Sequence, residues 1–132
     1  FTTGDSVVRK IRFSMIALAG LLLAVTSVPA AARFHTKLTR SNPPADTTLA
    51  AAPKVIELWW NEKPEVELTT VTVQGADSSK VALGKVRASK DLMGVAADVT
   101  GPVKPGKYSV AWKTAGKDGH AVRGTFNFSI SK

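Results

Sequence analysis

The sequence contains no cysteine among its 132 residues. A chain without cysteine has no disulfide framework, no thiolate metal site and no cysteine for lipid attachment at a mature N-terminus. Such a domain is held together by packing alone. Histidine is scarce as well, because His35 and His120 are the only two in the chain.

Clustered positive charge is also missing. The formal net charge is +8, but part of it lies in the N-terminal segment. From His35 onward, 14 Lys and Arg stand against 9 Asp and Glu, a net charge of +5, and these charges are scattered singly. Because no basic cluster is interleaved with aromatic residues that could stack on bases, we expect no nucleic-acid binding.

No apolar run is long enough for a comfortable membrane span. The run at residues 15–25 follows three basic residues and is followed by the small residues 30–32. This order is typical of a secretory signal peptide, the alternative being an uncleaved N-terminal anchor. We predict a signal peptide over residues 1–34, with cleavage near 32–34. One exported, periplasmic or otherwise extracytoplasmic domain would then cover residues 35–132 and would not span the membrane.

Short segments of alternating apolar and polar residues follow the signal region. About seven of them, at roughly ten-residue spacing, indicate an all-β, Ig-like sandwich with no helix. The predicted strands are residues 35–41, 54–61, 69–74, 80–86, 94–100, 107–113 and 123–130, with a connecting loop at residues 45–53. Ile56, Leu58 and Trp60 are expected to share one face of their strand, and Phe126, Phe128 and Ile130 one face of another.

Asp118 and His120 lie two residues apart between the last two predicted strands. Asp-Gly at such a place is a strong hairpin signal in its own right, so one interpretation is a turn with an exposed histidine. The other is that the turn offers an oxygen and a nitrogen ligand to a metal. Two ligands do not complete a site. His35 is the obvious supplier of a third, because an imidazole near a free amino terminus suits Cu(II).

Four blocks of sequence, in order, resemble the CopC family of small exported bacterial copper-binding proteins. They are H-T-K-L with Ser41 and Pro43, A-P-K-V with Leu58, P-G-x-Y-x-V-x-W ending at Trp112, and D-G-H-x-V-x-G-x-F-x-F ending at Phe128. The resemblance covers residues 35–132, and it implies a seven-stranded Greek-key β-sandwich.

The resemblance also implies a Cu(II) site. Its residues would be His35, through its imidazole and α-amino group, together with Asp118 and His120, and with Glu62 after the second long strand. The implied function is non-enzymatic: sequestering or transferring copper in copper resistance and homeostasis. The implied partner is an inner-membrane protein of the CopD type.

The chain departs from the family pattern in two places. Some members bind Cu(I) through a methionine-rich loop, whereas Met93 is the only methionine after the signal region, so we expect no Cu(I) site. The second departure is that Phe34 is a poor cleavage position and Ala32 a good one. Cleavage after Ala32 would leave Arg33, Phe34 and His35 as an N-terminal chelate.

Two other functions fit parts of the pattern. A metal-free Ig-like interaction or adhesion module would have the same strands, and it would tolerate loss of His120. A histidine-brace copper monooxygenase would share the ligands but needs a broad substrate surface, for which a domain of about 98 residues leaves little room.

Overall fold

The computed structural model describes residues 36–132, and all structural statements here concern that part of the chain. The only helical segment among these residues is a single 3-10 turn, η2, at Val66–Leu68. Residues 36–132 therefore contain no helix long and apolar enough to cross a membrane. The all-β fold predicted from the sequence is confirmed. The strands are β1 Leu38–Asn42, β2 Thr47–Leu49, β3 Val55–Trp60, β4 Thr70–Gly75, β5 Lys80–Val81, β6 Arg87–Ala88, β7 Gly94–Asp98, β8 Gly106–Ala115 and β9 Ala121–Ile130.

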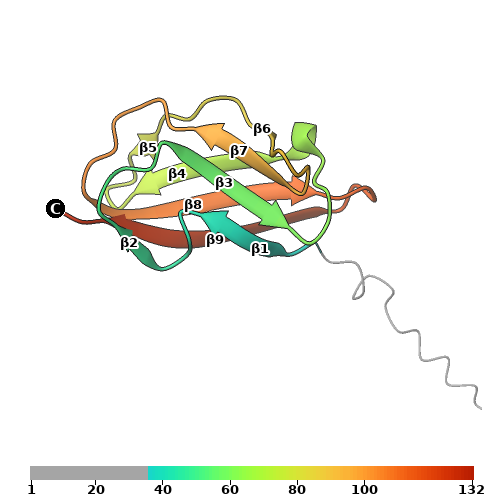
Figure 1. Cartoon of the computed structure of the whole chain (residues 1–132), viewed down its shortest axis with the longest axis horizontal. Helices are drawn as coiled ribbons and strands as arrows, with labels where there is room; N and C mark the ends of the chain where they lie inside the picture. Colours follow the sequence, from blue (N-terminus) through green and yellow to red (C-terminus); the bar gives the residue numbers. More distant parts are fainter. Residues whose placement is uncertain (1–35) are drawn as a thin grey trace, which may run out of the picture.

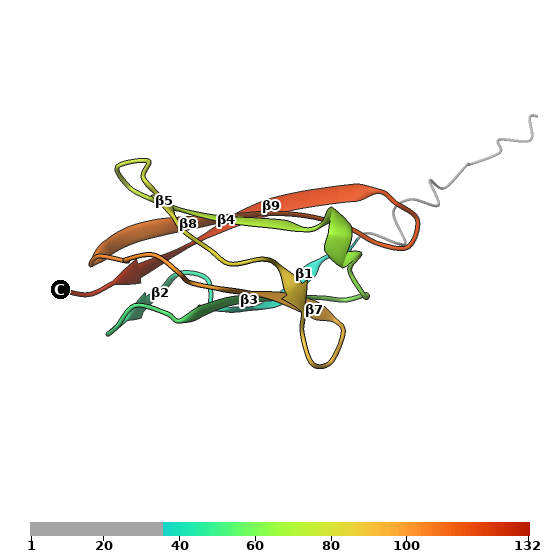
Figure 2. The same cartoon turned by 90° about the horizontal axis from the view of Figure 1, so that it is seen from above.

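The strands form two sheets that pack face to face as a sandwich (Figures 1 and 2). One sheet has the order β1-β3-β7-β6 and the other the order β2-β9-β8-β4-β5. The chain passes from one sheet to the other several times, and β8 and β9 form one long antiparallel hairpin. The turn of this hairpin lies at the opposite end of the sandwich from the C-terminus (Figure 1).

The core follows from the alternation of side chains along the strands. In β3, Ile56, Leu58 and Trp60 are buried, and the intervening residues are only partly so, as a period of two requires. In β9, the three residues predicted to share one face, Phe126, Phe128 and Ile130, are likewise all buried. Trp60 and Trp112 join the sheets edge to face, with ring centroids 5.5 Å apart.

Three strands are too short to have been predicted from alternation. β2 lies within residues 45–53, which were wrongly predicted to be only a loop, and it pairs in parallel with the end of β9. The predicted strand at residues 80–86 is only β5, and β6 follows it at Arg87. Segments of two or three residues carry no measurable period, so long-range pairing decides them. The strand predicted from residue 35 begins at Leu38.

Candidate metal centre

The turn between β8 and β9 presents the two residues singled out in the sequence. The strand register ends at Ala115 opposite Ala121, and residues 116–120 close the hairpin. Gly119 has φ +75°, a conformation that glycine adopts without steric cost, and its N–H donates to the Gly116 carbonyl at 2.9 Å. The hairpin predicted from Asp-Gly is therefore confirmed, and its geometry fixes where the flanking side chains emerge.

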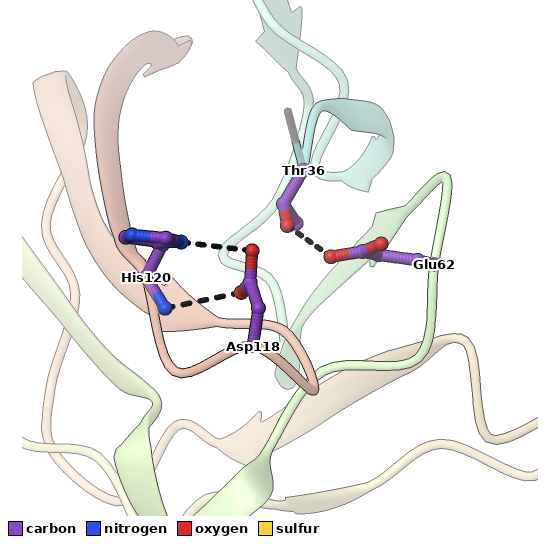
Figure 3. A network of polar contacts seen from close by, with 4 residues as sticks. All are labelled: Thr36, Glu62, Asp118 and His120. Carbon is purple, nitrogen blue, oxygen red and sulfur yellow. Dashed lines mark hydrogen bonds and ion pairs between the residues drawn. The ribbon is translucent and has the colours of Figure 1, made fainter. Parts of the chain in front are cut away.

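Asp118 and His120 form a hydrogen-bonded pair on this turn (Figure 3). Oδ2 of Asp118 lies 2.9 Å from Nδ1 of His120, and Oδ1 accepts the backbone N–H of His120 at 3.1 Å. The His120 side chain is 83% exposed and that of Asp118 49%. A carboxylate on one ring nitrogen orients the imidazole and leaves the other nitrogen, Nε2, for a ligand.

The pair shifts the acidity of both groups. The hydrogen bond from the His120 ring, with a further one from its backbone N–H, lowers the pKa of Asp118 below its usual value. The hydrogen bond to Asp118 and the attraction of its negative charge raise the pKa of His120 above 6.5. Asp118 is thus ionised at neutral pH, and the His120 ring takes up a proton more readily than a free imidazole.

Glu62 lies just beyond β3, in contact with two other segments of the chain. Its carboxylate accepts a hydrogen bond from the hydroxyl of Thr36 (Figure 3). It also lies against Gly116, where a Cβ would clash with Oε1 and would come within 3.0 Å of Cδ. Thr36 is buried and Glu62 half-buried. The end of β3 therefore links the start of the described chain to the base of the β8–β9 turn.

The structure brings together some of the predicted site residues and leaves one outside its scope. Asp118 pairs with His120, and Glu62 lies against Gly116, two residues before Asp118. His35 lies outside the described residues, directly before Thr36 in the sequence. In residues 36–132, no group of three His, Cys, Asp or Glu side chains is arranged to hold a metal ion.

Sequence reasoning missed Thr36 and Gly116. Thr36 stands next to His35 in the first of the blocks that carry the family resemblance, and Gly116 precedes the Asp-x-His motif by two residues. Neither carries a metal-ligating group, so no rule based on ligand chemistry would select them. Thr36 matters through its hydrogen bond with Glu62, 26 residues further along the chain. Gly116 matters because it has no side chain that would clash with the Glu62 carboxylate.

Comparison with known proteins identifies the family. A sequence model described as the CopC domain matches residues 38–131, which includes every strand. The chain belongs to the CopC domain family. The resemblance noted in the sequence is thereby confirmed.

Relatives of this CopC-domain chain match it along most of their length. The copper resistance protein C of Xanthomonas campestris pv. juglandis is 29% identical, over 89% of this chain and 97% of the relative. Protein YobA of Escherichia coli K12 is 26% identical, over 95% of this chain and 98% of the relative. Among solved structures, PcoC, a methionine-rich copper resistance protein from Escherichia coli, is 28% identical with a TM-score of 0.66, covering 74% of this chain and all of PcoC. Copper binding is consistent with this family.

Proposed function

We propose that this CopC-domain protein binds one Cu(II) ion at the β8–β9 turn and sequesters it or passes it on. The observation that carries the proposal is the Asp118–His120 pair, held by two hydrogen bonds on the turn at one end of the sandwich. The membership of the family, and relatives named for copper resistance, support the choice of metal.

The ligands we propose are His35, Asp118 and His120. Imidazole nitrogen, amine nitrogen and carboxylate oxygen make a donor set that suits Cu(II). Because Oδ2 of Asp118 is hydrogen-bonded to Nδ1 of His120 in the copper-free protein, ligation by both residues requires this hydrogen bond to open. His35 precedes Thr36 in the sequence, and Thr36 is hydrogen-bonded to Glu62, which lies against Gly116. The prediction of Glu62 as a fourth ligand remains a prediction, and its contacts favour another role.

The role we propose is that of a carrier rather than an enzyme. Because the mature domain has a single methionine, Met93, we expect it to handle Cu(II) and to lack a thioether site for Cu(I). We further propose export by residues 1–34, a periplasmic location and delivery to or from a membrane copper protein of the CopD type. Intact-mass measurement of the exported protein would decide between cleavage after Ala32 and a mature chain beginning at His35.

A Cu(II) titration of the purified mature protein tests the proposal. We expect one equivalent to bind tightly, with a tetragonal, nitrogen-rich electron paramagnetic resonance signal. Tryptophan fluorescence should fall on binding, and both responses should be lost in His120→Ala. Weak binding that His120→Ala leaves unchanged would sink the proposal, and a metal-free interaction module would then be the better account.

A further inference from the structure

The outer faces of the two sheets differ in charge. The strands of the four-stranded sheet carry equal numbers of basic and acidic residues, and each of these residues has a partner. Arg87 donates two hydrogen bonds to Asp98, and Arg40 stacks on the ring of Trp59 at 4.0 Å. Glu57 accepts a hydrogen bond from an asparagine on β1. The charges on this side of the sandwich are therefore balanced within the sheet.

The five-stranded sheet carries positive charge alone. Its strands, all within residues 36–132, contain no Asp or Glu. They contain basic residues that are all exposed, namely Lys80, Lys107, Lys113 and Arg123. The ion pairs formed within residues 36–132 include none of them. The fold thus gathers, on one of the two layers seen from the edge in Figure 2, charges that are scattered along the sequence.

Two of these cations lie directly opposite each other. The strand register pairs Lys113 of β8 with Arg123 of β9, and it places Thr70 of β4 on the other side of Lys113. Like charges directly opposite on neighbouring strands repel and destabilise a sheet. Because the strands of this sheet carry no carboxylate that offsets the repulsion, a negatively charged partner lying on the face would relieve it.

Between its cations, the face consists of short side chains without charge. Lys107 and Lys113 are six residues apart on β8, which is about 20 Å along a strand. The exposed residues of β4, β8 and β9 between them are Thr72, Gln74, Ala111, Thr125 and Asn127. The large hydrophobic residues exposed in the described part of the chain, Leu68 and Leu92, both lie outside these strands. The face is therefore broad and polar, with positive charge towards both ends.

The composition of this face favours a lipid surface over a protein as its partner. Specific protein interfaces are centred on aromatic or arginine anchors and are depleted in lysine, serine and alanine. On β8 and β9 the rings of Trp112, Phe126 and Phe128 are buried on the inner side, so they give the outer face no such anchor. A layer of anionic headgroups spreads its negative charge over an area and attracts basic residues without any pocket.

We propose that the outer face of the five-stranded sheet docks the protein onto an anionic phospholipid surface. Lys107, Lys113 and Arg123 supply the attraction, and the short side chains between them let the sheet lie along the headgroups. The β8–β9 turn lies at one end of this sheet, so Asp118 and His120 would sit at the edge of the contact. This inference goes beyond copper binding and does not depend on it.

Two triple variants separate this face from net charge. The face variant combines Lys107→Gln, Lys113→Gln and Arg123→Gln. The matched control removes the same charges, two Lys and one Arg, from exposed positions on or beside the four-stranded sheet: Lys54→Gln, Lys90→Gln and Arg40→Gln. Denaturant unfolding shows that each variant is folded, and Arg123→Gln alone should unfold no earlier than the wild type, because it relieves a repulsion.

The experiment measures cosedimentation of the exported form, purified without copper, with vesicles of phosphatidylglycerol and phosphatidylcholine in equal parts. At an ionic strength of about 0.1 M, where the Debye length is about 10 Å, each single substitution on the face should weaken binding roughly fivefold and the triple roughly 100-fold. The control should lose only a few-fold, because its charges lie on the far layer of the sandwich, about 10 Å further from the lipid. Vesicles of phosphatidylcholine alone, or about 1 M salt, should abolish binding of the wild type.

Several results would overturn this inference. Equal losses in the two triple variants would mean that net charge, and not this face, governs binding. Binding that persists on phosphatidylcholine alone or at about 1 M salt would mean that apolar contacts hold the protein on the bilayer. A wild type that ignores the phosphatidylglycerol vesicles would leave an acidic protein surface as the partner that fits the face. Because all these measurements use copper-free protein, none of them bears on the copper titration.

Discussion

The strands of the β8–β9 hairpin and its turn differ sharply in what surrounds their side chains. On the strands, Val110 of β8 and Phe128 of β9 are almost wholly buried between the sheets. At the turn, Asp118 and His120 are half or more exposed, and their partners are each other. Burial of apolar surface supplies most of the folding free energy, whereas an exposed pair supplies little. Substitutions on the strands should therefore change stability and leave copper binding intact, and substitutions at the turn should do the reverse.

The largest stability effect is expected on the strands of the hairpin, away from the turn. Phe128→Ala removes a ring that is 2% exposed and stacks on Tyr108 at 5.4 Å, so it should lower the free energy of unfolding by about 3–5 kcal/mol. Denaturant unfolding measures this. Since Phe128 lies at the far end of β9 from the turn, the folded variant should bind copper as the wild type does.

Thr125→Ala is the matched control for Phe128→Ala, because Thr125 lies on the outer, exposed face of the same strand. Its unfolding free energy should change by no more than about 0.5 kcal/mol. A folded Phe128→Ala protein that no longer bound copper would break the separation between the two regions.

The reverse result is expected at the turn. His120→Ala should reduce Cu(II) affinity by about 100-fold or more, since it removes a proposed ligand, while the unfolding free energy at neutral pH should stay close to that of the wild type. Copper titration and denaturant unfolding of the same preparation give both values. Lys117→Ala, an exposed change on the same turn, should alter neither. Equal losses in the two variants would mean that the turn attracts copper without a specific ligand.

A smaller effect is expected from pH, which acts on the nitrogen ligands. The hydrogen bond and the negative charge of Asp118 raise the pKa of His120 above its ordinary value, so protons compete with copper as the pH falls through this raised pKa. Affinity should therefore fall more than tenfold from about pH 7 to about pH 5. Asp118 has a lowered pKa and stays ionised over this range. A flat affinity profile from competition titrations with a calibrated chelator would argue against nitrogen ligation.

The Asp118–His120 pair has the opposite pH dependence in its effect on the stability of the copper-free fold. Because the folded protein holds the His120 proton more tightly than the unfolded chain, the pair stabilises the copper-free fold below about pH 6.5. That contribution is lost as the pH rises through the raised pKa. Copper binding therefore improves with pH while this part of the stability declines. Unfolding of the copper-free protein at pH 5.5 and 8, compared between wild type and His120→Ala, measures it.

The sequence predicted the regions where local pattern and global packing agree. Alternation identified β3, β8 and β9 because each buries one face, and Asp-Gly identified the turn because few residues adopt its backbone conformation. It did not reveal β2, because three residues have no period and their pairing with β9 bridges more than 75 positions of the chain.

The sequence predicted the candidate ligands at the turn, but not the contacts that Glu62 makes beside them. Asp118 and His120 are close in sequence and carry metal-binding groups, so a spacing argument finds them. The contacts of Glu62 with Thr36 and Gly116 arise only when β1, β3 and the hairpin come together in the fold. Threonine and glycine are not typical metal ligands, so their residue types give no signal in the sequence. Thr36 and Gly116 matter because the fold places them next to the Glu62 carboxylate.

The smallest effect is expected from a polar pair on the other sheet, which completes the comparison. Arg87 and Asp98 form two hydrogen bonds of 2.9 and 3.1 Å, and their side chains are 52% and 59% exposed, an exposure similar to that of Asp118. A double-mutant cycle of Arg87→Ala and Asp98→Ala should give a coupling of about 0–1 kcal/mol in unfolding, because solvent screens such pairs. Neither variant should change copper affinity. If they lowered it as His120→Ala does, exposed charge in general would govern copper binding, and the turn would have no special part in it.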